Sequence, residues 1–182
     1  MSNNLETIIL GSGEVFLSEF ERGAEIPADA EIETDTNRIG WIKGGAALEY
    51  TPTMQEIFDD LRKVVKRFIT GETVVFKTGV MTWCLSTLAT LSATFTYTDD
   101  PATKIRTLKI GGSGATVQKQ YFIRFIHRGE DGAEFRITIA GAAQAGFTLT
   151  FDPENPIVVD AEYSAGVLDD QGTRAILEEH YS

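Results

Sequence analysis

The stretch GETVVFKTGVMTWCLSTLATL, residues 71–91, combines a strand pattern with a helix pattern and decides the fold prediction. Its first part, residues 73–77, is rich in β-branched and aromatic side chains, which favour a pleated strand. Gly79 interrupts this run, and leucines then recur at helical spacing, at Leu85, Leu88 and Leu91. The stretch therefore predicts a strand that leads directly into a short helix.

Two further segments, 121–127 and 134–140, alternate between apolar and polar residues and are separated by a glycine-containing turn, which predicts a β-hairpin. Similar runs bounded by turn residues occur at 15–20, 39–50, 92–98, 105–110, 147–151 and 157–165, whereas 173–180 is a candidate short helix. This pattern predicts a mainly β fold, an antiparallel β-sandwich or barrel with one or two short helices and an extended loop or hairpin arm. The length of 182 residues favours a single domain spanning residues 1–182.

Residues 59–76 fit two local structures. The segment DDLRKVVKRF, residues 59–68, has the apolar spacing of an amphipathic helix. The same region also fits two strands, 64–69 and 73–76, that turn at Thr70-Gly71-Glu72. The β-branched residues and the glycine favour the hairpin, which we expect to form the arm.

The chain is acidic, with 27 Asp and Glu residues against 16 Lys and Arg residues and a formal net charge of −11. Proteins that bind nucleic acid by neutralising phosphates bring Lys and Arg to the backbone, so this balance argues against that class. It is compatible with a surface that DNA passes without sticking. It is equally explained by the solubility that an acidic surface gives to an abundant protein.

The sequence offers little catalytic chemistry, so we expect no enzyme, no cofactor and no metal. There are one cysteine and two histidines, without the spacing of a soft-metal site. The run Gly111-Gly112-Ser113-Gly114-Ala115 departs from the nucleophile-elbow pattern at its last position. No apolar run is long enough for a membrane helix, and the first residues do not form a signal peptide, so we expect synthesis in the cytosol and no membrane partner.

Three blocks that occur in a fixed order carry a resemblance to a known family. They are IGWIKGGAALEYTPT (39–53), FKTGVMTW (76–83) and VVDAEYSAGVLDD (158–170). Together they resemble the major tail tube proteins of long-tailed bacteriophages and related phage-derived particles. The resemblance implies a structural virion protein, made in the host bacterial cytoplasm, that self-assembles into hexameric rings. The rings stack into the hollow tail tube, the conduit for DNA ejection.

The resemblance also implies partners. These are further copies of the same chain, a tape measure protein, a tail terminator and baseplate or initiator proteins, while DNA passes through without specific binding. Two other functions remain open. One is the tube of a contractile injection or secretion particle. The other is a non-catalytic β-sandwich module for binding or adaptor roles, with Trp41 and Trp83 as its candidate contact residues.

Three groups of residues are candidates for assembly contacts. A basic cluster in an otherwise acidic chain indicates an inter-subunit arm that docks on a negative patch of a neighbouring copy: Arg62, Lys63, Lys66 and Arg67, with Phe68. The long acidic segment 21–37 corresponds, by the resemblance, to a loop that contacts the adjacent ring, with Glu21, Glu25, Asp29, Glu31 and Glu33 as its candidates. Polar members of an alternating strand are expected to face the lumen: Glu49, Thr51 and Gln55.

Overall fold

A computed structural model of the chain describes residues 13–180, apart from 22, 62, 82–83, 93, 113–118, 130–131, 145 and 152. The described strands are β1 (Glu14–Phe20), β2 (Trp41–Phe58), β3 (Val64–Met81), β4 (Thr96–Asp100), β5 (Ile105–Lys109), β6 (Gln120–Arg128), β7 (Glu134–Ala143), β8 (Val159–Ala165) and β9 (Ala175–His180). Two short helices accompany them, α1 (Asp29–Ile32) and α2 (Leu85–Ala89). The predicted mainly β, antiparallel fold class with short helices is confirmed.

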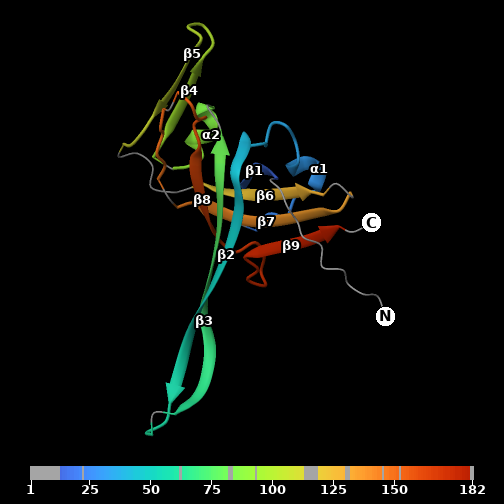
Figure 1. Ribbon diagram of the computed structural model, residues 1–182, viewed down its shortest axis with the longest axis vertical. Helices are drawn as coiled ribbons and strands as arrows, with labels where there is room; N and C mark the ends of the chain where they lie inside the picture. The colour runs from blue at the N-terminus through green and yellow to red at the C-terminus, as the bar shows by residue number, and fades with distance from the viewer. Residues whose placement is uncertain are drawn as a thin grey trace.

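The main sheet bends over itself to form two layers. Its strand order is β1-β6-β7-β8-β3-β2, with β9 added beside β7, and all of its pairings are antiparallel. Strands β2, β3 and β8 run across β1, β6, β7 and β9 in Figure 1. Strand β7 belongs to both layers, because it pairs with β6 over most of its length and with β8 through residues 141–143. The second, smaller sheet is the β4–β5 hairpin.

The main core lies between the two layers. Alternate residues of β6, Ile123 and Phe125, face this core together with Ile139 of β7 and Phe76 of β3. Tyr163 of β8 completes it and is 1% exposed. The opposite face of β6 is buried as well, because Phe122 and Ile126 pack in two smaller clusters on the other side of the sheet. Strand β6 is therefore buried on both faces.

Strands β2 and β3 form one long hairpin that extends away from the two layers as an arm (Figure 1). Residues 64–76 are extended and not helical, but the predicted hairpin within them is wrong, because its two arms, 64–69 and 73–76, belong to the single strand β3 and no turn occurs at Thr70-Gly71-Glu72. Gly71 lies inside β3 opposite Thr53, next to a register shift in the ladder. The chain turns instead at residues 59–63, where the Asp59 carboxylate accepts hydrogen bonds from the backbone N–H groups of Leu61 (3.0 Å) and Lys63 (2.7 Å).

Other local predictions have mixed outcomes. The strand that leads into a helix is found as β3 and α2, and the 121–140 hairpin is found as β6 and β7. The candidate helix at 173–180 is instead strand β9, because its residues pair with the open edge of β7 from Glu134 to Ile139. The strand expected at 147–151 is absent, and those residues have no regular secondary structure.

Glycine at position 79 is required by a close backbone approach. Between Ile42 and Ala46 strand β2 bulges, and a Cβ placed at Gly79 would meet the Lys43 carbonyl oxygen at 2.3 Å. At Gly71 the nearest atom to such a Cβ is 3.7 Å away, which is an ordinary contact. The bulge and the glycine beneath it thus depend on each other.

We expect Gly79→Ala to lower the thermal midpoint by roughly 4–10 °C, because overpacking costs about 1–3 kcal/mol in a domain of this size. The matched Gly71→Ala variant should keep the midpoint or raise it slightly, since it restricts only the unfolded chain. Differential scanning calorimetry compares the two. Equal midpoints for both variants would contradict the close approach at Gly79.

Candidate functional site

The arm carries a row of exposed apolar side chains along one face. Residues that are opposite each other in an antiparallel pair point to the same side, so the register of β2 and β3 assigns each residue to a face. On one face Glu72 and the Glu56–Arg67 ion pair alternate with four apolar residues, Tyr50, Met54 and Phe58 of β2 and Ile69 of β3. Each of these four side chains is more than half exposed, between 53% and 58%. We call them the apolar arm face.

The apolar arm face continues the core-facing side of the same strands. Nearer the body, Leu48 of β2 and Val74 and Phe76 of β3 point to this side, and they pack in the main core. Strand β8 flanks β3 only from Val75 to Val80, so the outer part of the hairpin receives no third strand. Apolar side chains of this side thus continue beyond the part of the molecule that covers them, interspersed there with Glu72 and the Glu56–Arg67 ion pair.

The opposite face of the arm is polar over most of its length. It carries Glu49, Thr51, Thr53 and Gln55 of β2, with Thr73 of β3. The structure therefore places the three predicted lumen residues on one face, turned away from the core and exposed to solvent. Ile57 and Phe68, near the turn, and Val75, opposite Glu49, are apolar members of this side. We call the stretch from Glu49 to Gln55 the polar arm face.

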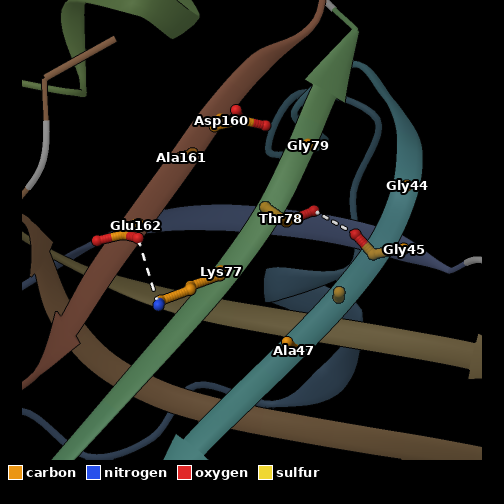
Figure 2. A pocket seen from close by; sticks show the side chains of 10 residues that line it. Gly44, Gly45, Ala47, Lys77, Thr78, Gly79, Asp160, Ala161 and Glu162 are labelled. Atoms are coloured by element: carbon orange, nitrogen blue, oxygen red, sulfur yellow. Dashed lines mark hydrogen bonds and ion pairs between the residues drawn. The ribbon is translucent and has the colours of Figure 1, made fainter.

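A shallow depression of about 310 Å³ adjoins the polar arm face where β2, β3 and β8 meet (Figure 2). Small residues of β2, β3 and β8 form much of its lining, including Gly45, Gly79 and Ala161. The ammonium group of Lys77 lies 2.9 Å from Glu49 and 3.5 Å from Glu162. The hydrogen bond with Glu49 raises the pKa of Lys77, so this cation stays charged.

The electrostatic character of the depression is acidic. Asp160 also lines it, so three carboxylates, Asp160, Glu162 and the adjacent Glu49, surround the single cation Lys77. Lys77 pairs with Glu49 and Glu162 at an open surface, and no nucleophile–base pair is among the residues that line the depression. The arrangement suits a polar wall rather than a reaction site.

The predicted basic cluster at the tip of the arm is divided between the two faces. Lys66 lies on the side of Ile57, with its ammonium 5.7 Å from the ring centre of Phe68. Arg67 lies on the opposite side and pairs with Glu56. Lys63 is exposed in the turn, and Arg62 lies outside the described residues. The cluster therefore surrounds the tip and does not form one flat patch.

The acidic segment 21–37 is fastened to the body of the molecule. Of its five predicted contact residues, Glu21, Glu25 and Glu31 are exposed. Asp29 and Glu33 instead form ion pairs with arginines of β6 and β7. Between them, Ile32 is fully buried against Phe16 and Ile126. Asp29 stays 51% exposed beside its ion pair, whereas Glu33 is 13% exposed, so Glu33 is the predicted contact residue that the body encloses.

Glu33 is the centre of a buried ion cluster that the sequence analysis missed. Its carboxylate oxygens lie 3.2 Å from Arg124, 3.0 Å from Arg136 and 3.7 Å from Arg128. The side chains of Arg124 and Arg136 are 3% and 9% exposed. Arginines at alternating positions of apolar strands are the only signal in the sequence, and such positions are usually solvent-facing. Buried charges require partners, and segment 21–37 supplies them.

We expect Glu33→Gln to destabilise the protein by about 3 kcal/mol, because it leaves buried arginines without their shared carboxylate. The matched variant Glu31→Gln, at an exposed position of the same segment, should stay within about 0.5 kcal/mol of the parent. Urea denaturation of both variants measures the difference. A Glu33→Gln variant as stable as Glu31→Gln would contradict the buried cluster.

The cluster also predicts a dependence of stability on pH. The hydrogen bond from Arg124 holds the pKa of the Asp29 carboxyl below its usual range. A carboxyl group whose pKa is lower in the folded state stabilises the fold above its unfolded pKa and loses that contribution as the pH falls through the folded pKa. The parent should therefore lose stability faster than Asp29→Asn as the pH falls below 4, in thermal melts compared at successive pH values. Parallel curves would contradict this ion pair.

Other chemical features are few in the part of the chain that the structure describes. No group of three or more His, Cys, Asp or Glu residues there could hold a metal ion. The described helices are also too short to cross a membrane. Trp41 is 68% exposed, with the Arg38 guanidinium 5.0 Å from the centre of its ring. Trp83 and Ser113 lie outside the described residues.

Comparison with known proteins adds no assignment. No protein-family model matches the chain, and no curated protein matches its sequence. The arm and its two faces are therefore the main evidence on which a function can be argued.

Proposed function

We propose that the chain is the subunit of a self-assembling hollow tube, the tail tube of a long-tailed phage. Copies would associate into rings, hexameric by the family resemblance, and the rings would stack. The observation that carries the proposal is the apolar arm face, an exposed continuation of the core. The blocks 39–53, 76–83 and 158–170 support the family, and they fall on β2, on β3 with the residues that follow it, and on β8 with the residues that flank it.

The energetics of the arm favour association between chains. Fully burying one large apolar side chain stabilises a protein by about 1.5–3 kcal/mol, so covering four half-exposed ones contributes on the order of 3–6 kcal/mol per arm. In a monomer this surface is an aggregation hazard. In a closed ring or a stack, every arm meets the same complementary surface, so the hazard becomes a specific interface.

The polar arm face supports the conduit part of the proposal. When the apolar arm face packs against a neighbour, the opposite side of the same two strands remains open. That side carries Glu49, Thr51 and Gln55, and next to it lies the acidic depression with Asp160 and Glu162. Such a wall repels phosphates and offers DNA little counterion release. We propose that this side lines the channel.

The remaining parts of the proposal follow from the same assembly. The tip of the arm is apolar on both sides, at Ile57, Phe58 and Leu61, and is surrounded by Lys63 and Lys66. A tip of this kind is suited to insertion between acidic neighbours. A tape measure protein inside the tube, a terminator and an initiator would complete the particle in the virion.

We expect the double variant Met54→Ser/Ile69→Ser to stay monomeric under conditions in which the parent forms rings or tubes in negative-stain electron microscopy. Its thermal midpoint as a monomer should match the parent's, because both side chains are already exposed. The control Thr51→Ser/Thr53→Ser, on the opposite face of the same strand, should assemble like the parent. Assembly of the double variant at the parent's concentration would contradict the role of the apolar arm face, and a parent that stays monomeric at every concentration would count against self-assembly.

A further inference from the structure

From Tyr50 to Phe58, the side of the arm that carries the apolar arm face consists of five cross-strand pairs, each with one residue of β2 and the residue opposite it in β3. Consecutive pairs are two residues apart along β2, so they are evenly spaced on that strand. In order from the body to the tip, the pairs are Tyr50–Val74, Pro52–Glu72, Met54–Ile69, Glu56–Arg67 and Phe58–Val64. Apolar pairs and pairs with charged side chains therefore alternate, and the order is the same in both directions from the Met54–Ile69 pair.

This order makes the side of the arm self-complementary. A second copy can lie on it face to face, with its strands antiparallel to those of the first and with the two Met54–Ile69 pairs over each other. A two-fold axis that lies in the contact plane and runs across the strands relates the two copies, so β2 lies over β2 and β3 over β3. Apolar pairs then meet apolar pairs, and pairs with charged side chains meet each other.

The charges match in sign in this arrangement. Glu72 and Arg67 both belong to β3, one pair on either side of the centre, so Glu72 of each copy faces Arg67 of the other. The residue opposite Glu72 in its own hairpin is Pro52, which carries no charge. Arg67 keeps 63% of its side chain exposed beside Glu56, and a guanidinium can bind more than one carboxylate. If the strands of the two copies were parallel, Glu72 would lie over Pro52 and have no cation to face.

The apolar side chains supply the area of the contact. Met54 and Ile69 lie on the axis and meet their own counterparts, while Tyr50 of each copy meets Phe58 of the other. All four are more than half exposed in the single chain, and the outer part of the hairpin extends away from the body (Figure 1). An interface of this extent is small, and small interfaces belong to weak complexes that exchange readily.

We infer that two free copies of the chain pack arm on arm in a two-fold dimer, with the Met54–Ile69 pairs at its centre and a Glu72–Arg67 ion pair on each side. A two-fold contact closes on itself and does not extend into rings or stacks. The dimer is therefore a state beyond the tube proposed above and does not depend on it. Because both contacts use the same face, the dimer covers the apolar arm face of free subunits and releases it when contacts in a ring compete.

Charge reversal tests the dimer by sedimentation velocity, below the concentration at which rings or tubes form. Glu72→Arg alone and Arg67→Glu alone each place like charges opposite each other, so each should raise the dissociation constant of the dimer by about tenfold or more. An equimolar mixture of the two variants should form a heterodimer, because every reversed charge then faces its opposite. The control Lys66→Glu, on the other face of the same strand, should dimerise like the parent.

A single cysteine on the axis gives a second test. In a Cys84→Ser background, Ile69→Cys brings two identical positions together across the axis, so mild oxidation should link two identical chains. Thr53→Cys, on the polar arm face, should give no such product. Neighbours in a ring are related head to tail, which separates equivalent positions by a whole subunit, so a ring contact does not produce this link.

Failure of the dimer and failure of the tube are distinguishable. Tubes in the electron microscope from a parent that shows no dimer overturn the inference and leave the tube standing. A dimer that persists in both single charge variants, or an Ile69→Cys variant that forms no link to itself, also overturns the inference. A heterodimer from the mixed variants, without rings or tubes of the parent at any concentration, supports the inference and counts against the tube.

Discussion

The structure depends on one amphipathic surface that is longer than the body that covers it. The β2–β3 hairpin places apolar residues on one side from Leu48 to Phe58, interrupted in its outer part by Glu72 and the Glu56–Arg67 ion pair, and its first part supplies one wall of the core. The alternation that places apolar side chains in the core of the body thus also leaves apolar side chains exposed on the arm. Folding and the proposed association would draw on one side of the same hairpin, and a substitution that weakens one would affect the other unless it lies beyond Tyr50.

The buried arginines of β6 and β7 have a different effect, since they fix a segment that the sequence presents as a loop. Arg124 and Arg136 stand on a sheet face that is otherwise filled by Phe122 and Ile126. Without their carboxylate partners, the two buried guanidinium groups would have neither solvent nor a counter-charge. The ion pairs with Asp29 and Glu33 therefore bind segment 21–37 to the body. Its outward carboxylates are consequently held on a rigid support and lose little conformational freedom when they meet another molecule.

Much of the fold could be predicted from the sequence, and the failures have physical reasons. The alternation of apolar and polar residues predicted β6 and β7. Glycine followed by leucines at helical spacing predicted the change from β3 to α2. The hairpin turn was misplaced because Gly71 is a typical turn residue, whereas the real turn rests on one side-chain acceptor, Asp59. Residues 173–180 have helical propensity, yet an open edge of β7 made them a strand. The three lumen candidates lie on one face because the alternation of side chains along a strand alone decides the face of each residue. The pairing of Asp29 and Glu33 with arginines about a hundred positions away, in contrast, leaves no signal in the local sequence.

The order of strands in the chain also bears on how the protein is made. Glu14 of β1 pairs with Ile126, 112 positions later, whereas β2 and β3 are neighbours joined by a short turn. During synthesis the hairpin can close while β6, β7 and β9 are still unmade, since local pairs form far faster than distant ones. A nascent chain therefore exposes a finished arm on an unfinished body, with the whole apolar side of the hairpin open. Neighbouring ribosomes on one message bring such arms close together, so contacts between exposed arms can compete there with folding.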